Sequence, residues 1–143
     1  MKITTRMIEE DLFESSNIHG NKVPIDMRKK PLKEGLSPVE LLQAALASCA
    51  GVDVVAMLKK RKKHIEAFTI EIEAKRKEHH PRWLTDIHCS YLLTSLDVTE
   101  TELTKLAHLA LDKYCSVASS LKSVITISVH VIKPASHVDD TQL

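Results

Sequence analysis

A long apolar segment that begins at Ser37 constrains the fold more than any other feature of this sequence. Ser37-Pro38-Val39-Glu40 has the form of a helix capping box, with proline at the first helical position. Apolar residues follow at positions 41, 42, 45, 46, 49, 52, 55 and 56, which is the spacing of one wide helical face. The pattern predicts a helix that continues to Lys60 and is about 35 Å long. We expect so long and so apolar a helix to lie under a sheet or against a partner chain.

The segment before this helix predicts a β-hairpin followed by a loop. Residues Lys2–Phe13 have mixed β propensity, and Lys22–Met27 resumes a short strand. The intervening stretch Ser15–Asn21 is rich in turn-forming residues, so we expect the two strands to pair as a hairpin. The basic segment Arg28–Leu36 contains a proline and a glycine, and it predicts a loop.

The segment after the helix predicts a second hairpin, a helix and a final strand. Phe68–Ala74 alternates between apolar and polar residues, and Trp83–Leu93 is expected to pair with it. Thr99–Glu102 has the form of a second capping box, and Ile125–Val131 alternates as the last strand. This order of elements predicts an α+β fold with antiparallel sheets. One side of the second strand in this hairpin carries Trp83, Ile87, Cys89 and Tyr91.

Length and composition favour one domain with an aliphatic core. The chain has 143 residues, of which 43% are hydrophobic and only 3% aromatic. Few aromatic side chains are available to stack on bases, and the formal net charge of +1 creates no basic field. We therefore expect a single domain over residues 1–143, with a polar tail at 135–143 and no nucleic-acid partner.

Three features favour a cytoplasmic protein. The first residues, Met1–Leu12, lack the apolar core of a signal peptide. No stretch approaches 18 uninterrupted apolar residues, so we expect no membrane-spanning segment. The number of cysteines, three, is odd, which favours a reducing compartment. In such a compartment a cysteine pair is typical of catalysis, redox chemistry or metal binding.

The cysteines Cys49 and Cys115 each allow two readings. Cys49 lies on the apolar face of the long helix, where a thiol is either a small core filler or the atom around which the helix is built. Gly51 costs about 1 kcal/mol relative to alanine in a helix interior, so it needs a reason. Cys115 lies where one helix ends and another turn begins, and amide donors there would lower a thiol pKa. Neither residue belongs to a CxxC pair, and we assign Cys89 to packing.

No other motif predicts a metal or cofactor site. The eight histidines are scattered, without HExxH or paired CxxC spacing. With three glycines the chain has no Gly-rich loop that would cradle a phosphate. The basic run Lys59–Lys63 could contact RNA phosphates, although the negative end of the helix dipole already accounts for it. We expect no cofactor and no metal.

The stretch "SPVELLQAALASCAGVDVVAMLKKR", followed by "LDKYCSVASSL", resembles the OsmC/Ohr family of osmotically inducible and organic hydroperoxide resistance proteins. The resemblance covers residues Leu36 to Val131, and the order of elements also matches. It implies an intertwined homodimer in which sheets wrap around long central helices. In that dimer the N-terminal hairpin and loop, residues 1–36, contribute to the association of the two chains.

The resemblance also implies a chemistry for two cysteines. In the peroxidase members the cysteine that matches Cys49 attacks the hydroperoxide as a thiolate and becomes a sulfenic acid. The cysteine that matches Cys115 then resolves it to a disulfide, which an external dithiol reduces. The implied function is thiol-dependent reduction of organic or inorganic hydroperoxides in oxidative stress defence.

The sequence departs from the peroxidase pattern at three positions. Val39 occupies the place of the catalytic glutamate, and Glu40 is one residue later, about 100° around the helix axis. The early turn at residues 17–20 has no activating arginine, so Arg28 is our candidate for thiolate activation and Glu40 for positioning. Ser116 follows the second cysteine, where proline is frequent. These departures leave open a second hypothesis, a non-enzymatic dimer that holds a small ligand, and a third, RNA contact through Lys59–Lys63.

Overall fold

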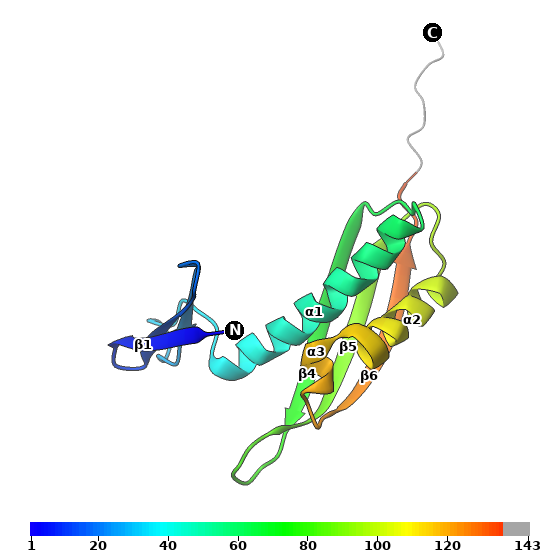
Figure 1. Cartoon of the computed structure of the whole chain (residues 1–143). Helices are drawn as coiled ribbons and strands as arrows, with labels where there is room; N and C mark the ends of the chain where they lie inside the picture. Colours follow the sequence, from blue (N-terminus) through cyan, green and yellow to red (C-terminus); the bar gives the residue numbers. More distant parts are fainter. Residues whose placement is uncertain (136–143) are drawn as a thin grey trace. The chain divides into compact units, whose positions relative to one another are not determined.

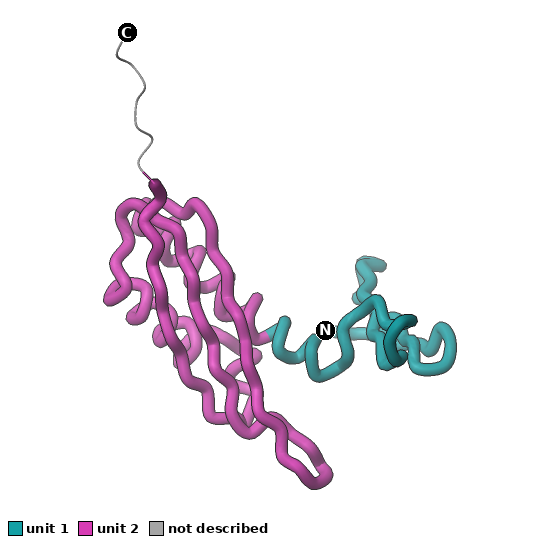
Figure 2. Tube along the Cα trace, turned by 180° about the vertical axis from the view of Figure 1, so that it is seen from behind, with its two compact units in different colours: residues 1–45 teal, residues 46–143 magenta. Residues whose placement is uncertain are grey.

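The computed structural model describes residues 1–135, so the polar tail predicted at 135–143 lies outside the described residues, apart from Ala135. The chain divides into two compact units, Met1–Ala45 (unit 1) and Leu46–Leu143 (unit 2), which Figure 2 shows in different colours. The expectation that these residues form a single domain stays a prediction.

Unit 1 contains a three-stranded antiparallel sheet where the sequence predicted two strands. The strands are β1 (Ile3–Glu9), β2 (Leu12–Asn17) and β3 (Lys22–Asp26), in the order β1-β2-β3. The predicted first strand was wrong, because the chain reverses at Asp11, whose φ of 60° is in the left-handed region. Aspartate tolerates that region better than most residues, yet a lone Asp without glycine is a weak turn signal.

The predicted long helix is confirmed as α1 (Pro38–Lys60). The capping box forms, because the Ser37 N–H donates to Glu40 Oε2 at 2.7 Å and the Glu40 N–H donates to Ser37 Oγ at 3.4 Å. Among residues 1–135, α1 is the one helix long and apolar enough to cross a membrane, a test that a core helix also passes. Its side chains at i, i+4 spacing are buried as in a core helix: Leu46, Ala50, Val54 and Leu58.

Unit 2 contains a second three-stranded sheet. Strands β4 (Ala67–Arg76) and β5 (Leu84–Thr94) pair antiparallel, as expected. Strand β6 (Val124–Ile132) pairs with β5 in parallel, which differs from the expected antiparallel sheet. The reason is the long crossover between them, since a connection of this length carries the chain back to the starting end of β5. The α+β class itself is confirmed.

The crossover is helical and lies on the same face of the sheet as α1 (Figure 1). It consists of α2 (Glu100–Leu109), a π-helical turn (Ala110–Tyr114) and α3 (Ser116–Ser119). Within residues 46–135, no helix lies on the opposite face of the sheet, which is turned toward the viewer in Figure 2. The helix-covered face of β5 is therefore core, with alternate residues Ile87, Cys89, Tyr91 and Leu93 at most 1% exposed.

Gly51 allows α1 to approach the sheet closely. A β-carbon at this position would lie 3.2 Å from Cδ1 of Ile70 and 3.6 Å from Cε1 of Phe68, both on β4. The first distance is shorter than most contacts of a real β-carbon, so the missing side chain is what lets the helix fit. Packing of the helix on the sheet therefore explains the glycine that the sequence left unexplained.

Candidate functional site

Cys49 and Cys115 are neighbours in unit 2, close enough that the Cys49 thiol acts on the pKa of Cys115 through side-chain hydrogen bonding and charge. Cys49 comes from α1 and is half-buried, whereas Cys115 follows the π-helical turn and is 0% exposed. Both are free thiols. Folding thus brings together two cysteines whose spacing in the sequence could not indicate proximity.

The backbone around Cys115 fixes the direction of its side chain. Its N–H donates to the carbonyl of Ala110 at 2.8 Å, which closes the π-helical turn. Cys115 is also the N-cap of α3, and its sulfur accepts a hydrogen bond from the Ala118 N–H at 3.4 Å. Turns of π-helix occur frequently at functional sites, and the local sequence does not predict this one. The predicted helix start after Cys115 is confirmed.

The pKa of the Cys115 thiol is raised, contrary to the sequence-based expectation. Burial is the largest cause, because it disfavours the thiolate, and the hydrogen bond with Cys49 acts in the same direction. The Ala118 N–H lowers the pKa of Cys115, as the helix N-terminus predicts, but burial outweighs it. A thiolate at Cys115 therefore needs further stabilisation from its surroundings.

Cys89 and Tyr91 complete the cluster from β5. Burial raises the pKa of the Cys89 thiol to about 11, with a smaller effect from the charge on Cys115. Burial likewise raises the pKa of Tyr91, with smaller effects from Cys89 and Cys115. The Tyr91 hydroxyl is the one buried side-chain N or O atom among residues 1–135 that has no hydrogen-bond partner. Sequence reasoning placed Tyr91 only on the apolar side of its strand.

Arg28, the candidate for thiolate activation, has carboxylate partners in unit 1. Its Nε and Nη2 donate to the two oxygens of Asp26, both at 3.0 Å, and its Nη1 donates to Glu9 Oε1 at 2.9 Å. The hydrogen bond to Asp26 raises the pKa of Arg28, and Arg28 holds the pKa of Asp26 far below its usual range. These contacts give Arg28 a structural role, and its catalytic role stays a prediction.

Glu40, the candidate for positioning, closes the capping box with Ser37 as described above. It also accepts a hydrogen bond from Lys33 Nζ at 2.8 Å. Lys33 is the first cause, and Ser37 the second, that lowers the pKa of Glu40 to about 2. The capping role predicted from the sequence is confirmed, and a part in the chemistry stays a prediction.

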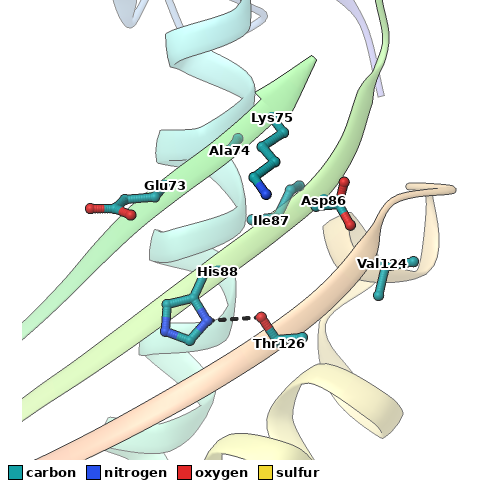
Figure 3. Close-up of a pocket in the computed structure, with 8 residues that line it drawn as sticks. All are labelled: Glu73, Ala74, Lys75, Asp86, Ile87, His88, Val124 and Thr126. Atoms are coloured by element: carbon teal, nitrogen blue, oxygen red, sulfur yellow. Dashed lines mark hydrogen bonds between the residues drawn. The ribbon is translucent and has the colours of Figure 1, made fainter. Parts of the chain in front are cut away.

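A cavity of about 350 Å³ lies at the sheet of unit 2, and no cysteine lines it (Figure 3). His88 on β5 holds its ring there between two hydroxyl groups, with Nδ1 at 2.8 Å from Thr126 Oγ1 and Nε2 at 3.0 Å from Ser128 Oγ. The lining residues are Glu73, Ala74, Lys75, Asp86, Ile87, His88, Val124 and Thr126. Residues 1–135 contain no group of three His, Cys, Asp or Glu side chains that could hold a metal ion.

The fold and the adjacent thiols define an α+β protein with a dithiol site. Residues 31–130 match the OsmC family, described as OsmC-like protein, and the chain belongs to this family. Protein YhfA of Escherichia coli strain K12 is 25% identical over 128 residues, which cover 90% of this chain and 94% of that protein.

Solved structures share this fold over nearly the whole chain. The crystal structure of a hypothetical protein from Aquifex aeolicus VF5 has a TM-score of 0.81 at 29% identity, and covers 94% of this chain and 97% of its own. The organic hydroperoxide resistance protein OhrB of Bacillus subtilis has a TM-score of 0.58 at 15% identity, and covers 92% and 96%. At 15% identity, the similarity to OhrB shows a shared fold alone.

Proposed function

We propose that this protein is a thiol-dependent peroxidase that reduces organic or inorganic hydroperoxides in the cytoplasm. The observation that carries the proposal is the proximity of the thiols of Cys49 and Cys115, one half-buried and one fully buried. A peroxidatic thiol must be reachable by substrate, and a resolving thiol must lie within bonding reach of it. The similarity in fold to organic hydroperoxide resistance proteins supports the same class of substrate.

The reaction proceeds in three steps. The Cys49 thiolate attacks one peroxide oxygen, the O–O bond breaks, and the alcohol or water leaves after taking up a proton. The Cys115 sulfur then attacks the sulfenic acid on Cys49, so that a disulfide forms and the oxygen leaves as water. An external dithiol reduces the disulfide and is itself oxidised to a disulfide. In this scheme Arg28 is the candidate for stabilising the Cys49 thiolate, and Glu40 is the candidate for positioning.

We also propose that the functional form is a homodimer, with residues 1–36 contributing to the contact between chains. Both sheets have open edge strands, which are templates for pairing with another chain. Helix α1 is apolar on several sides, and Val52 on it is 68% exposed. Unit 1 also exposes large apolar side chains: Ile3, Met7, Ile8, Val23, Met27 and Leu36. Such surfaces are typical of protein–protein contacts.

A non-enzymatic dimer that binds a small apolar ligand or a thiol metabolite is the second candidate. It is favoured by the contacts of Arg28 and Glu40, because both side chains already have structural partners. Val39, in the position of the glutamate of peroxidase members, favours it too. Alkylation of Cys49 against pH separates the two candidates. A midpoint at the ordinary value for free cysteine, about 8.5, supports ligand binding over catalysis.

The direct test is stopped-flow measurement of peroxide consumption by wild type, Cys49→Ser and Cys115→Ser, with Cys89→Ser as the matched control. We expect Cys49→Ser to abolish the reaction and Cys115→Ser to allow one oxidation without turnover. The Cys89→Ser variant should keep the wild-type rate. If Cys49→Ser and Cys115→Ser both consume peroxide as wild type does, the protein is not a cysteine peroxidase.

A further inference from the structure

Tyr91 is a buried side chain that neither the family resemblance nor the proposed reaction uses. Tyr91 is 1% exposed, and its hydroxyl has no hydrogen-bond partner among residues 1–135. A buried tyrosine hydroxyl usually has a partner, and an exception in a native protein needs an explanation. One explanation is that the acceptor for the Tyr91 hydroxyl is present only in another chemical state of the protein.

Tyr91 lies beside the two β4 side chains that pack against Gly51 of α1. Tyr91 lies opposite Ile70 in the β4–β5 register, and the Ile70 side chain reaches to Gly51, two residues after Cys49. The ring of Phe68 is 6.3 Å from that of Tyr91, and Phe68 also lies beside Gly51. Tyr91 therefore belongs to the same layer of side chains as the dithiol.

Tyr91 also lies within electrostatic reach of Cys115 from the side of β5. The charges on Cys89 and Cys115 both act on the hydroxyl, and Cys89 is two residues away on the same face of the strand. Cys115 itself is fully buried, and its backbone donors are the N–H groups of Ala118, at 3.4 Å, and Val117, whose effect on its pKa burial outweighs. These backbone donors leave a buried thiolate incompletely stabilised, because burial disfavours the charged form.

We propose that Tyr91 is a positioning residue for the resolving sulfur, whose hydroxyl donates a hydrogen bond to the Cys115 thiolate when the Cys49–Cys115 disulfide is reduced. This inference rests on the proposed dithiol function. The thiolate of an external dithiol attacks the half-buried Cys49 sulfur and forms a mixed disulfide. The bond between the two protein sulfurs breaks, and its electron pair goes to Cys115. The second thiol of the reductant then releases Cys49.

The hydroxyl matters at the step in which Cys115 leaves. Thiol–disulfide exchange is faster when the leaving sulfur is a more stable thiolate. Burial makes Cys115 a poor leaving group, and a donor that is idle in the dithiol state offsets this. The arrangement also accounts for the missing partner of Tyr91, because its acceptor is a charge that exists only transiently.

The test compares Tyr91→Phe with Tyr114→Phe, the only other tyrosine of the chain, which is 54% exposed and adjacent to Cys115. Both substitutions remove one oxygen atom. With the disulfide formed by diamide, reduction by dithiothreitol should be several-fold slower in Tyr91→Phe and unchanged in Tyr114→Phe. Equal rates in all three proteins would overturn the proposal.

A second measurement does not depend on any disulfide. In proteins that keep Cys115 as the sole cysteine (Cys49→Ser, Cys89→Ser), thiolate absorbance against pH gives the Cys115 pKa. Tyr91→Phe should raise it by about one unit, a tenfold lower acid dissociation constant. An unchanged Cys115 pKa, with a melting temperature lowered as by a broken hydrogen bond, would show a purely structural Tyr91.

The two proposals fail separately. If peroxide consumption survives in Cys49→Ser, the peroxidase is lost, while the effect of Tyr91→Phe on Cys115 ionisation still stands or falls on its own. If peroxide consumption depends on both cysteines but the Tyr91→Phe protein ionises and reduces as wild type does, the function holds and Tyr91 has no part in it.

Discussion

Gly51 and Ile70 stand so close that the smallest side chain at position 51 would press on the Ile70 methyl group. The Cβ of an alanine there would be 3.2 Å from Ile70 Cδ1. This contact sets the depth of the helix turn that carries Cys49. The glycine therefore allows close packing of α1 on the sheet, and this packing sets the position of the half-buried Cys49 thiol relative to β4 and β5.

A double-mutant cycle measures this contact. Gly51→Ala gains helix propensity of about 1 kcal/mol but overpacks the contact at a cost of about 1 to 3 kcal/mol. We expect Gly51→Ala to destabilise the wild-type protein. In the Ile70→Val background the same substitution should cost less, because valine lacks the Cδ1 atom. Urea unfolding of wild type, the two single variants and the double variant should give a coupling free energy of about 1 kcal/mol. Its sign should make the double variant more stable than the sum of the single effects predicts. Strict additivity would mean that Ile70 moves aside freely.

Asp26 predicts a dependence of stability on pH in unit 1. Its buried carboxylate accepts hydrogen bonds from Arg28 and from the N–H groups of Glu34 and Gly35, at 2.8 and 3.1 Å. Arg28 first, and then these N–H groups, lower the pKa of Asp26 from its value of 3.8 in an unfolded chain. The stabilisation is therefore complete above about pH 4 and lost as the pH falls further.

The measurement is the melting temperature between neutral pH and pH 2, for wild type and Asp26→Asn. Wild type should lose stability on acidification more steeply than the variant, since the variant has no carboxylate to protonate at this position. Glu9→Gln, which removes only the exposed partner of Arg28, is the matched control and should follow wild type. Parallel profiles for wild type and Asp26→Asn would contradict the prediction.

Thr99 predicts a local stability effect at the start of α2. Its Oγ1 accepts the Glu102 N–H at 3.1 Å, whereas the Glu102 carboxylate pairs with Arg61 and Lys63 and does not complete the capping box. Thr99→Ala should cost about 1 kcal/mol in the free energy of unfolding by urea. The control is Thr101→Ala, two residues later and exposed, which should change little. Equal effects would show that the cap hydrogen bond contributes nothing.

Cys89 should be chemically silent. Its thiol is 1% exposed, and burial raises its pKa from 9.0 to about 11, so the neutral form persists at physiological pH. Iodoacetamide should label Cys89 only after unfolding. Mass spectrometry of protein labelled in the folded and in the unfolded state checks this. Because the folded state keeps the proton longer, this group also makes stability fall as pH rises from about 9 to 11. In Cys89→Ala that part of the alkaline loss should vanish.

The helices were predictable from the sequence because their signals are local. Ser37 and Glu40 satisfy each other's backbone three residues apart, and the apolar face of α1 repeats every turn. The alternation of Phe68–Ala74 and Ile125–Val131 likewise fixed two strands from neighbouring residues. Periodicity gives the type of an element, however, and says nothing about its partner or direction.

The features that the sequence did not predict depend on long-range packing or on weak turn signals. The reversal at Asp11 has no glycine to mark it, and the parallel pairing of β6 follows from where the crossover ends. The proximity of Cys49 and Cys115 was suggested only by family resemblance. The lack of a partner for the Tyr91 hydroxyl depends on neighbours from other elements, which the sequence around Tyr91 does not specify.

The sulfur at the start of α3 has a practical consequence for anyone who mutates this protein. Serine is among the best residues to begin a helix, and a cysteine in the same place is a weaker acceptor for the Ala118 amide. Replacing Cys115 by serine therefore removes the reactive sulfur and supplies a better acceptor for the Ala118 N–H at the start of α3. Whatever that variant loses in redox behaviour is a loss of sulfur chemistry, since the short helix that follows is held at least as well as before.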